Sequence, residues 1–224
     1  PRVQWPTGAE RLGVPVRGRI SADERMLEGR VLARLTDLGW GGTMRELFAP
    51  GNTDTVASPA MIDACVRVLA DWNWDERPAA IVTVPSRRSP ELIDSVAAGL
   101  SAAGRLPRLG SLEHAGGGPT GDPGGNSAYR LAGVWDRFAL SQELADGIRN
   151  LDGPVLLIDD LVDSRWTMTI AARTLLRAGA PAVLPFALAG RGHVDLVLVV
   201  VVYAALQFGP AAGLLTGAAA GMVQ

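Results

Sequence analysis

The chain has no lysine: its 224 residues include 21 basic side chains, and every one of them is arginine. A Walker-type phosphate loop needs a lysine and is therefore excluded within this chain. Schiff-base chemistry, which needs a lysine amine, is excluded with it. The net charge of -2 gives no general polyanion-binding character.

Cysteine and histidine are almost as scarce. Cys65 is the single cysteine, so no internal disulfide can form, and His114 and His193 are the only histidines. These three residues cannot supply the ligand set of a zinc site. No secretory signal pattern opens the sequence, and the first residue, Pro1, is not a methionine, which indicates a fragment.

What the chain does contain is an alternation of β-rich and helical segments. Apolar β-rich runs predict strands at 79–84, 106–109, 154–159 and 182–188. Helical spacing predicts helices at 22–38, 59–70, 90–103, 127–138, 141–149 and 166–178, with a turn at 40–42. This alternation is typical of an α/β fold with a mainly parallel sheet and right-handed crossovers.

Three regions are expected along the chain. Residues 1–50 form an N-terminal extended and helical connector, residues 51–190 form the α/β domain, and residues 192–224 form a hydrophobic tail. From Leu196 onward there is no charged residue, and glycines recur every fourth position from Gly209 to Gly221. The apolar run exceeds the roughly 20 residues that a bilayer span needs, and the glycine spacing suits helix packing in lipid. A membrane-type tail over 194–224 is favoured over a buried strand and helix that complete the sheet.

The most informative segment is 155–169. An apolar run from Val155 to Ile158 leads into two adjacent carboxylates, Asp159 and Asp160. A buried strand would deliver this pair to the carboxyl edge of a parallel sheet, where open α/β folds bind ligands. The turn at 163–167 precedes a helix, and such a turn leaves backbone N–H groups that suit a phosphate. The alternative is that the carboxylates are solvated and only cap the turn.

The functional interpretation assigns a role to each polar side chain. Asp159 and Asp160 would accept hydrogen bonds from ribose hydroxyls, while Ser164 and Thr167 would hold a 5′-phosphate. At the end of the first strand, Ser86, Arg87 and Arg88 would meet a second anionic group, unless the arginines are plain surface charge. A phosphorylated sugar is the ligand that this combination favours.

Residues 155–169 resemble the signature of type I phosphoribosyltransferases, which have a Rossmann-like α/β fold. The resemblance implies a phosphoribosyl pyrophosphate site, with Asp159 and Asp160 at the ribose and Mg²⁺ bridging to them indirectly. It also places the 5′-phosphate on Asp163, Ser164, Arg165 and Thr167, the pyrophosphate at residues 86–88, and residues 116–125 in or near a flexible hood.

The loop departs from that family at three positions. The family usually has a glycine where this chain has Arg165 and a small or apolar residue where it has Trp166. Asp163 replaces a neutral residue and would repel phosphate. These departures favour ligand binding over efficient turnover.

A second resemblance covers residues 1 to about 190. The segments that carry it are Trp5 to Gly8, Arg11 to Val14, Leu35 to Trp40, Gly116 to Gly121, Gly124 to Ser127 and Asp159 to Met168. Together they resemble the C-terminal region of actinobacterial-type RecQ-family DNA helicases, in which a phosphoribosyltransferase-like domain follows the motor. The resemblance implies an ATP-dependent parent protein in DNA repair and recombination, with Arg165 and Trp166 as ordinary members of the loop. The motor is absent from this chain.

The tail resembles the first membrane segments of the rod-shape-determining MreD family. If both resemblances hold, two unrelated proteins are joined near Arg191. The expected location is the cytoplasm, in association with the nucleoid, with membrane insertion confined to the tail.

Three hypotheses follow from the sequence. The first is an accessory phosphoribosyltransferase-like domain of a RecQ-type helicase that acts through ligand or DNA contacts rather than through its own catalysis. The second is an active Mg²⁺-dependent phosphoribosyltransferase, and the third is a membrane piece whose function lies in the tail. Trp72, Trp74 and Trp135 could stack on nucleic-acid bases, but core packing is favoured for them.

Overall fold

The computed structural model describes residues 1–116, 126–191 and 205–208. Its centre is a five-stranded sheet in the order β1-β7-β6-β2-β3, in which every neighbouring pair is parallel. The strands are β1 (Arg30–Arg34), β2 (Ala80–Thr83), β3 (Arg108–Ser111), β6 (Val155–Val162) and β7 (Val183–Gly190). A small antiparallel pair joins β4 (Glu113–His114) to β5 (Phe138–Ala139). The expected α/β fold with a mainly parallel sheet is confirmed.

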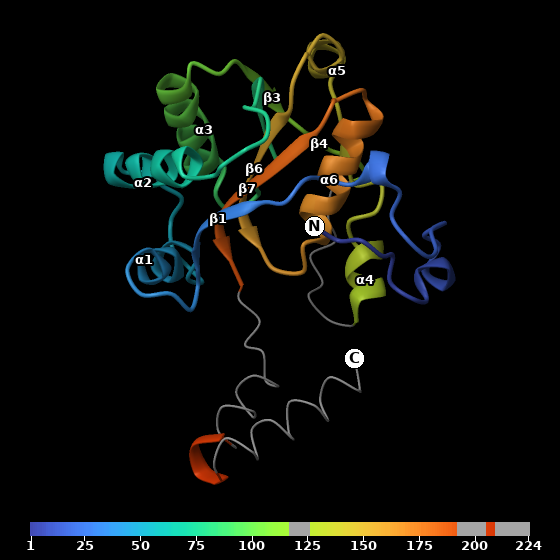
Figure 1. The fold of residues 1–224 in the computed structure, drawn as a ribbon, viewed down its shortest axis with the longest axis horizontal. Helices are drawn as coiled ribbons and strands as arrows, with labels where there is room; N and C mark the ends of the chain where they lie inside the picture. The colour runs from blue at the N-terminus through green and yellow to red at the C-terminus, as the bar shows by residue number, and fades with distance from the viewer. Residues whose placement is uncertain (117–125, 192–204, 209–224) are drawn as a thin grey trace. The chain divides into compact units, whose positions relative to one another are not determined.

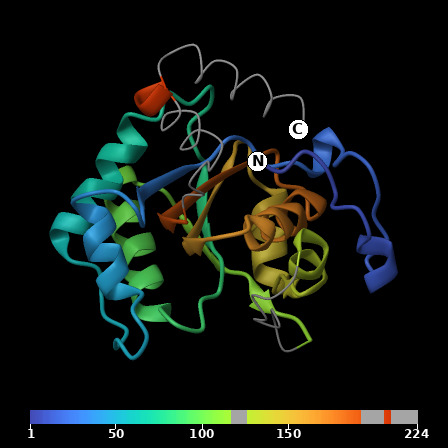
Figure 2. The same ribbon diagram turned by 90° about the horizontal axis from the view of Figure 1, so that it is seen from below.

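Helices cover both faces of the sheet (Figures 1 and 2). One face carries α1 (Trp40–Leu47), α2 (Pro59–Ala70) and α3 (Pro90–Gly104). The other face carries α4 (Ser127–Ala132), α5 (Gln142–Arg149) and α6 (Trp166–Arg177), together with the 3-10 turns η1 (Ala9–Leu12) and η2 (Ala22–Glu24). Coverage on both sides explains why β7 is buried along its whole length and why its sequence is almost continuously apolar.

Strand β6 shows how the two cores are divided. Val155 and Leu157 pack in the core beneath α6, whereas Leu156 and Ile158 pack in the core beneath α2 and α3. Successive side chains of a strand point to opposite faces, so this alternation continues into the polar end of the strand.

Local signals explain several helix starts. The Ser58 side chain accepts a hydrogen bond from the Met61 backbone N–H, with Pro59 at the first helical position. Ser141 caps α5 in the same way through the Leu144 N–H. The helices expected at 59–70, 90–103, 141–149 and 166–178 are present within one residue at each end.

The helix expected at 22–38 is wrong. Residues 22–24 form the short turn η2, and residues 30–34 form β1, which pairs with β7 from Arg30 opposite Phe186 to Arg34 opposite Gly190. The apolar spacing in this segment fits the period of a helix and that of a strand, and pairing with the buried strand β7 decided in favour of the strand. The segment expected to be a connector thus supplies an edge strand of the sheet.

The turn expected at 40–42 is also wrong, because α1 begins at Trp40. A Cβ at Gly41 would lie 2.5 Å from the Arg34 carbonyl oxygen, so the glycine allows α1 to approach β1. The helix expected at 127–138 ends at Ala132, and Phe138 belongs to β5.

Residues 1–191 form one compact unit and residues 192–224 form another. The membrane-type tail predicted for 194–224 lies outside the described residues except for a helical turn at 205–208. Among the residues that the structure describes, no helix has both the length and the apolar character needed to cross a membrane.

Candidate functional site at the carboxyl edge of the sheet

The two central strands β2 and β6 lie side by side, but the helices that follow them lie on opposite faces. α3 follows β2 and packs in one core, and α6 follows β6 and packs in the other. The loops after the two strands therefore diverge. In an open α/β sheet this topological switch point is where a crevice for a ligand forms.

Asp159 and Asp160 lie at this point, one and two residues beyond the end of the β2 pairing. The last paired residue of β2 is Thr83, opposite Ile158, whereas β6 continues to Val162 along β7. The prediction that β6 ends at Asp159 is wrong, since the acidic pair lies inside the strand. The side chains of Asp159 and Asp160 consequently leave the strand on opposite sides.

Asp159 is a buried carboxylate with an exposure of only 4%. Its Oδ1 accepts the backbone N–H of Asp160 at 2.9 Å, and its Oδ2 has no hydrogen-bond partner among the described residues. Burial and the neighbouring charge of Asp160 raise the pKa of Asp159 well above its ordinary value. A buried, half-satisfied acid of this kind is a candidate functional group.

Asp160 is hydrogen-bonded to the loop after β2. Its Oδ2 accepts the hydroxyl of Ser86 at 2.7 Å, and its Oδ1 accepts the Leu161 N–H at 2.6 Å. The same Ser86 oxygen accepts the backbone N–H groups of Arg88 and Ser89, at 3.2 and 2.9 Å. We call Ser86, Asp159 and Asp160 the acidic crevice. The structure thus brings together residues that lie 74 positions apart in the chain.

The other two residues of the expected pyrophosphate loop are both exposed arginines. The Arg88 guanidinium binds the carbonyl of Ala49 at 2.7 Å, beside the end of α1. Burial lowers the pKa of His114, and the positive charge of Arg87 lowers it further. A hydrogen bond ties Ser86 of this loop to the acidic pair.

One residue of the loop between β6 and α6 has a backbone conformation that glycine adopts more easily than other residues. Arg165, just before the first residue of α6, has φ 67° and ψ -2°, a left-handed conformation that costs most side chains about 1 kcal/mol. Arg165 is exposed, whereas Ser164 and Thr167 are half-buried. Asp163 forms an ion pair with Arg130 of α4 at 3.1 Å, which offsets its charge.

Trp166 is fully buried and fastens this loop to the N-terminal segment. Its indole ring stacks on Trp5 with centroids 6.0 Å apart, and the Arg2 guanidinium lies 4.6 Å from the ring centroid. Its Nε1 donates to the Ser127 hydroxyl at 2.8 Å. Arg2 also donates from Nη2 to the Ser164 carbonyl at 2.7 Å and from Nε at 3.2 Å.

The stack continues to a second arginine. Trp135 meets Trp5 edge-on at 5.8 Å, and Arg173 lies 4.6 Å from the Trp135 ring centroid. Arg173 is buried and forms an ion pair with Glu24 at 3.0 Å, and Arg177 binds the same carboxylate at 2.7 Å. We call Arg2, Trp5, Trp135, Trp166 and Arg173 the arginine–tryptophan cluster. The core role favoured for Trp135 agrees with these contacts, and Trp72 and Trp74 likewise stack on each other at 5.4 Å.

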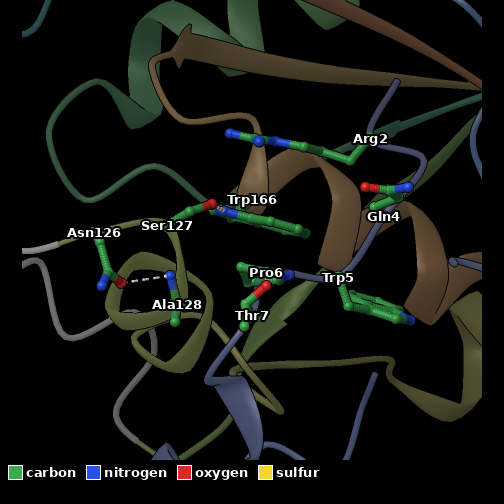
Figure 3. A pocket seen from close by; sticks show the side chains of 9 residues that line it. All are labelled: Arg2, Gln4, Trp5, Pro6, Thr7, Asn126, Ser127, Ala128 and Trp166. Atoms are coloured by element: carbon green, nitrogen blue, oxygen red, sulfur yellow. Dashed lines mark hydrogen bonds between the residues drawn. The ribbon is translucent and has the colours of Figure 1, made fainter. Parts of the chain in front are cut away.

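A hollow of about 420 Å³ lies beside Trp166, between the N-terminal segment and the start of α4 (Figure 3). Its lining comprises Arg2, Gln4, Trp5, Pro6, Thr7, Asn126, Ser127, Ala128 and Trp166. Neither acid of the acidic crevice lines it. No local pattern in the sequence indicated that the partner of Arg2 would be Ser164, 162 positions away.

The described residues fit Mg²⁺ only as an ion carried in with a substrate. No group of three or more His, Cys, Asp or Glu side chains in this part of the chain is arranged to hold a metal. Mg²⁺ commonly binds through one or two carboxylates plus substrate phosphates, and Asp159 and Asp160 can supply no more than that. Cys65 is no alternative nucleophile, because burial raises the pKa of its thiol to about 12.

No protein-family model matches the chain, and no curated protein matches it.

Proposed function

We propose that this chain is a phosphoribosyltransferase-like accessory domain of a RecQ-type DNA helicase, and that it acts by binding a ligand or DNA rather than by catalysis of its own. The observation that carries the ligand-binding part is the acidic crevice at the switch point of a parallel sheet. The link to a helicase rests on the sequence resemblance over residues 1–190.

Two features favour binding over turnover. The raised pKa of Asp159 favours its neutral form, which attracts a metal-bridged substrate less than a carboxylate does. The loop before α6 is fastened by Arg2 and by the buried ring of Trp166. A loop held by such contacts has little freedom to close around a substrate, and loop closure is the step that excludes water in many enzymes.

An active Mg²⁺-dependent phosphoribosyltransferase is the second candidate. Arg165 favours it in one respect, because this residue keeps the left-handed backbone that a glycine would adopt most easily. The loop therefore has a backbone conformation that a glycine would favour at this position, although its side chains differ from the pattern of the family that it resembles. Asp159 and Asp160 would then hold the ribose, and Ser164 and Thr167 the 5′-phosphate.

Binding of phosphoribosyl pyrophosphate with Mg²⁺ to the full chain tests the ribose site. Calorimetry should show saturable binding that Asp159→Asn/Asp160→Asn weakens roughly 10-fold or more, because loss of the charged hydrogen bond of Asp160 alone costs about 1.5 kcal/mol or more. The exposed Asp152→Asn serves as the matched control. Binding that is absent, or indifferent to the double change, would refute a phosphoribosyl site.

Turnover separates the two candidates. The full chain is incubated with phosphoribosyl pyrophosphate, Mg²⁺ and a panel of nucleobases, and pyrophosphate release is measured. The accessory-domain proposal expects no release above the rate without protein. Release that depends on Asp160 would establish the enzyme instead.

A DNA titration at several salt concentrations tests the contact with nucleic acid. If arginines meet phosphates, the affinity must fall as salt rises, since each neutralised phosphate releases counterions. Affinity that does not change with salt would remove DNA from the proposal and leave the small ligand alone.

A further inference from the structure

We infer that the hollow beside Trp166 is a second binding site, for a phosphate monoester such as the phosphate of a mononucleotide or of a DNA end. It is separate from the proposed ribose site, because its lining contains neither Asp159 nor Asp160. The inference rests on the size of the hollow, on the charges around it and on the donors in its wall.

Size allows a small organic phosphate. The volume of about 420 Å³ lies in the range of pockets that hold drug-sized ligands. Figure 3 shows Arg2 on one side of the Trp166 ring and Pro6 on the other, with Thr7 beside Pro6.

The charge balance favours an anion. Among the described residues that line the hollow, Arg2 is the only charged one. Partial burial and then the positive charges of Arg165 and Arg130 lower the pKa of Arg2, so three guanidinium groups influence one another in this region. One of these guanidinium groups, that of Arg130, is paired with Asp163. The cationic surroundings favour an anion such as a phosphate monoester, which carries about -1.5 to -2 charges at neutral pH.

The wall offers suitable donors. Arg2 uses Nε and one terminal nitrogen to bind the Ser164 carbonyl, so its other terminal nitrogen remains on the guanidinium edge. Ser127 accepts from the Trp166 indole, and within the described residues its own hydroxyl hydrogen is available to donate. Asn126 uses its side-chain oxygen to cap α4, and its amide nitrogen has no acceptor among the described residues, so it is a further donor. An arginine with hydroxyl and amide donors is a common phosphate-binding set.

The test uses the full chain and two ligands that share the phosphate group. One is thymidine 5′-monophosphate, and the other is a short single-stranded oligonucleotide with a 5′-phosphate; thymidine and the unphosphorylated oligonucleotide are the controls. We expect saturable binding that needs the phosphate. Binding of both phosphates at similar strength identifies the phosphate alone as the determinant, whereas much tighter binding of the oligonucleotide identifies a DNA end as the source.

Two variants locate the site. Arg2→Gln should weaken binding roughly 10- to 100-fold, because it removes one charge-assisted contact. Thr7→Glu adds a negative charge to an exposed wall residue, so the fold should tolerate it, and it should weaken binding by a similar factor. Arg67→Gln removes an exposed arginine of α2, on the opposite face, and should leave binding unchanged.

Asp160→Asn keeps this inference distinct from the proposed ribose site. We expect it to reduce binding of phosphoribosyl pyrophosphate but not of the monophosphate. Phosphate binding that is absent, or that both Arg2→Gln and Thr7→Glu leave unchanged, would overturn the second site whatever the outcome at the acidic crevice.

Discussion

The acidic crevice and the arginine–tryptophan cluster each bury a charged side chain, but the neighbouring charge has the same sign in the crevice and the opposite sign in the cluster. In the crevice, the Asp159 Oδ2 is buried and has no partner among the described residues, and a second carboxylate follows it in the chain. In the cluster, the buried Arg173 Nε likewise makes no hydrogen bond within the described residues, but the Glu24 carboxylate lies 3.0 Å from it and an indole ring lies against the guanidinium. A buried charge beside a like charge destabilises the fold, whereas a buried charge beside an opposite charge is nearly neutral.

This difference separates a candidate site from its scaffold. A group that destabilises the fold without structural benefit is the better functional candidate. The cluster explains the burial of Trp166 without any ligand, because the ring packs against Arg2 and Trp5. Four substitutions test the contrast, and their expected effects decrease from Trp166 to Arg130.

Trp166→Ala should lower the free energy of unfolding by about 3–5 kcal/mol, the usual cost of deleting a fully buried large aromatic ring. Urea denaturation followed by circular dichroism measures it. Tyr129→Ala is the matched control, since Tyr129 is 58% exposed and should cost far less. A loss below about 1 kcal/mol for Trp166→Ala would mean that the cluster does not hold the fold together.

Glu24→Gln should cost about 1–2 kcal/mol, because Arg173 would keep its buried charge while losing its partner. Burial raises the pKa of Glu24, but the hydrogen bonds and charges of Arg173 and Arg177 outweigh it and hold the pKa below its ordinary value of 4.5. This stabilisation is therefore present above pH 4.5 and disappears as the pH falls through the lower folded value. Unfolding curves between about pH 3 and 7 should converge for the two proteins at the acid end. A constant difference across that range would contradict the ion pair.

Asp159→Asn should act in the opposite direction and stabilise the protein at neutral pH and above by about 1 kcal/mol, since it removes the cost of keeping a buried acid protonated at a pH where the unfolded chain releases the proton. The raised pKa means that the native state keeps a proton which the unfolded chain has released. The contribution of Asp159 is thus greatest below its ordinary pKa of 3.8 and declines as the pH rises through the folded value. In Asp159→Asn the free energy of unfolding should no longer decline in this way as the pH rises. In Asp152→Asn, at an exposed position, the decline should remain. If the variant is less stable than the parent at about pH 8, Asp159 is a structural acid.

Arg130→Gln should have the smallest effect, about 0.2–1 kcal/mol, because the ion pair with Asp163 is about one-third exposed on both sides. Thermal unfolding at low and high salt measures it, and the difference should shrink as salt rises. A larger, salt-independent loss would show that Arg130 belongs to the packed cluster and not to its rim.

Much of the fold follows from local patterns. The central strands β6 and β7 and the helices α2, α3, α5 and α6 were predictable, because each has a clear period and recognisable ends. The segment 22–47 was not, since its apolar residues fit a helix and a strand equally and the choice depends on pairing with β7. Gly41 resembles a turn residue in the sequence but serves to bring α1 close to β1.

For the candidate site, too, the sequence indicated some features and not others. The sequence indicated the acidic pair and Ser86 as polar ends of two parallel strands, and the structure brings Ser86 and Asp160 into contact. The sequence could not indicate that Arg88 would bind the Ala49 carbonyl, or that Arg2 would bind the Ser164 carbonyl. Those contacts depend on the direction in which the loops leave the sheet. The local spacing of apolar residues does not determine that direction.

The sequence by itself determined that this protein is an α/β fold with a carboxylate pair at a strand and no lysine-based chemistry, because period, composition and residue type are local properties. Tertiary structure alone decided that Asp159 is buried without a partner among the described residues, that Asp160 is tied to Ser86, and that Trp166 lies between Arg2 and Trp5. The physical reason is that burial and pairing are properties of surroundings, which residues more than 70 positions distant in the chain provide.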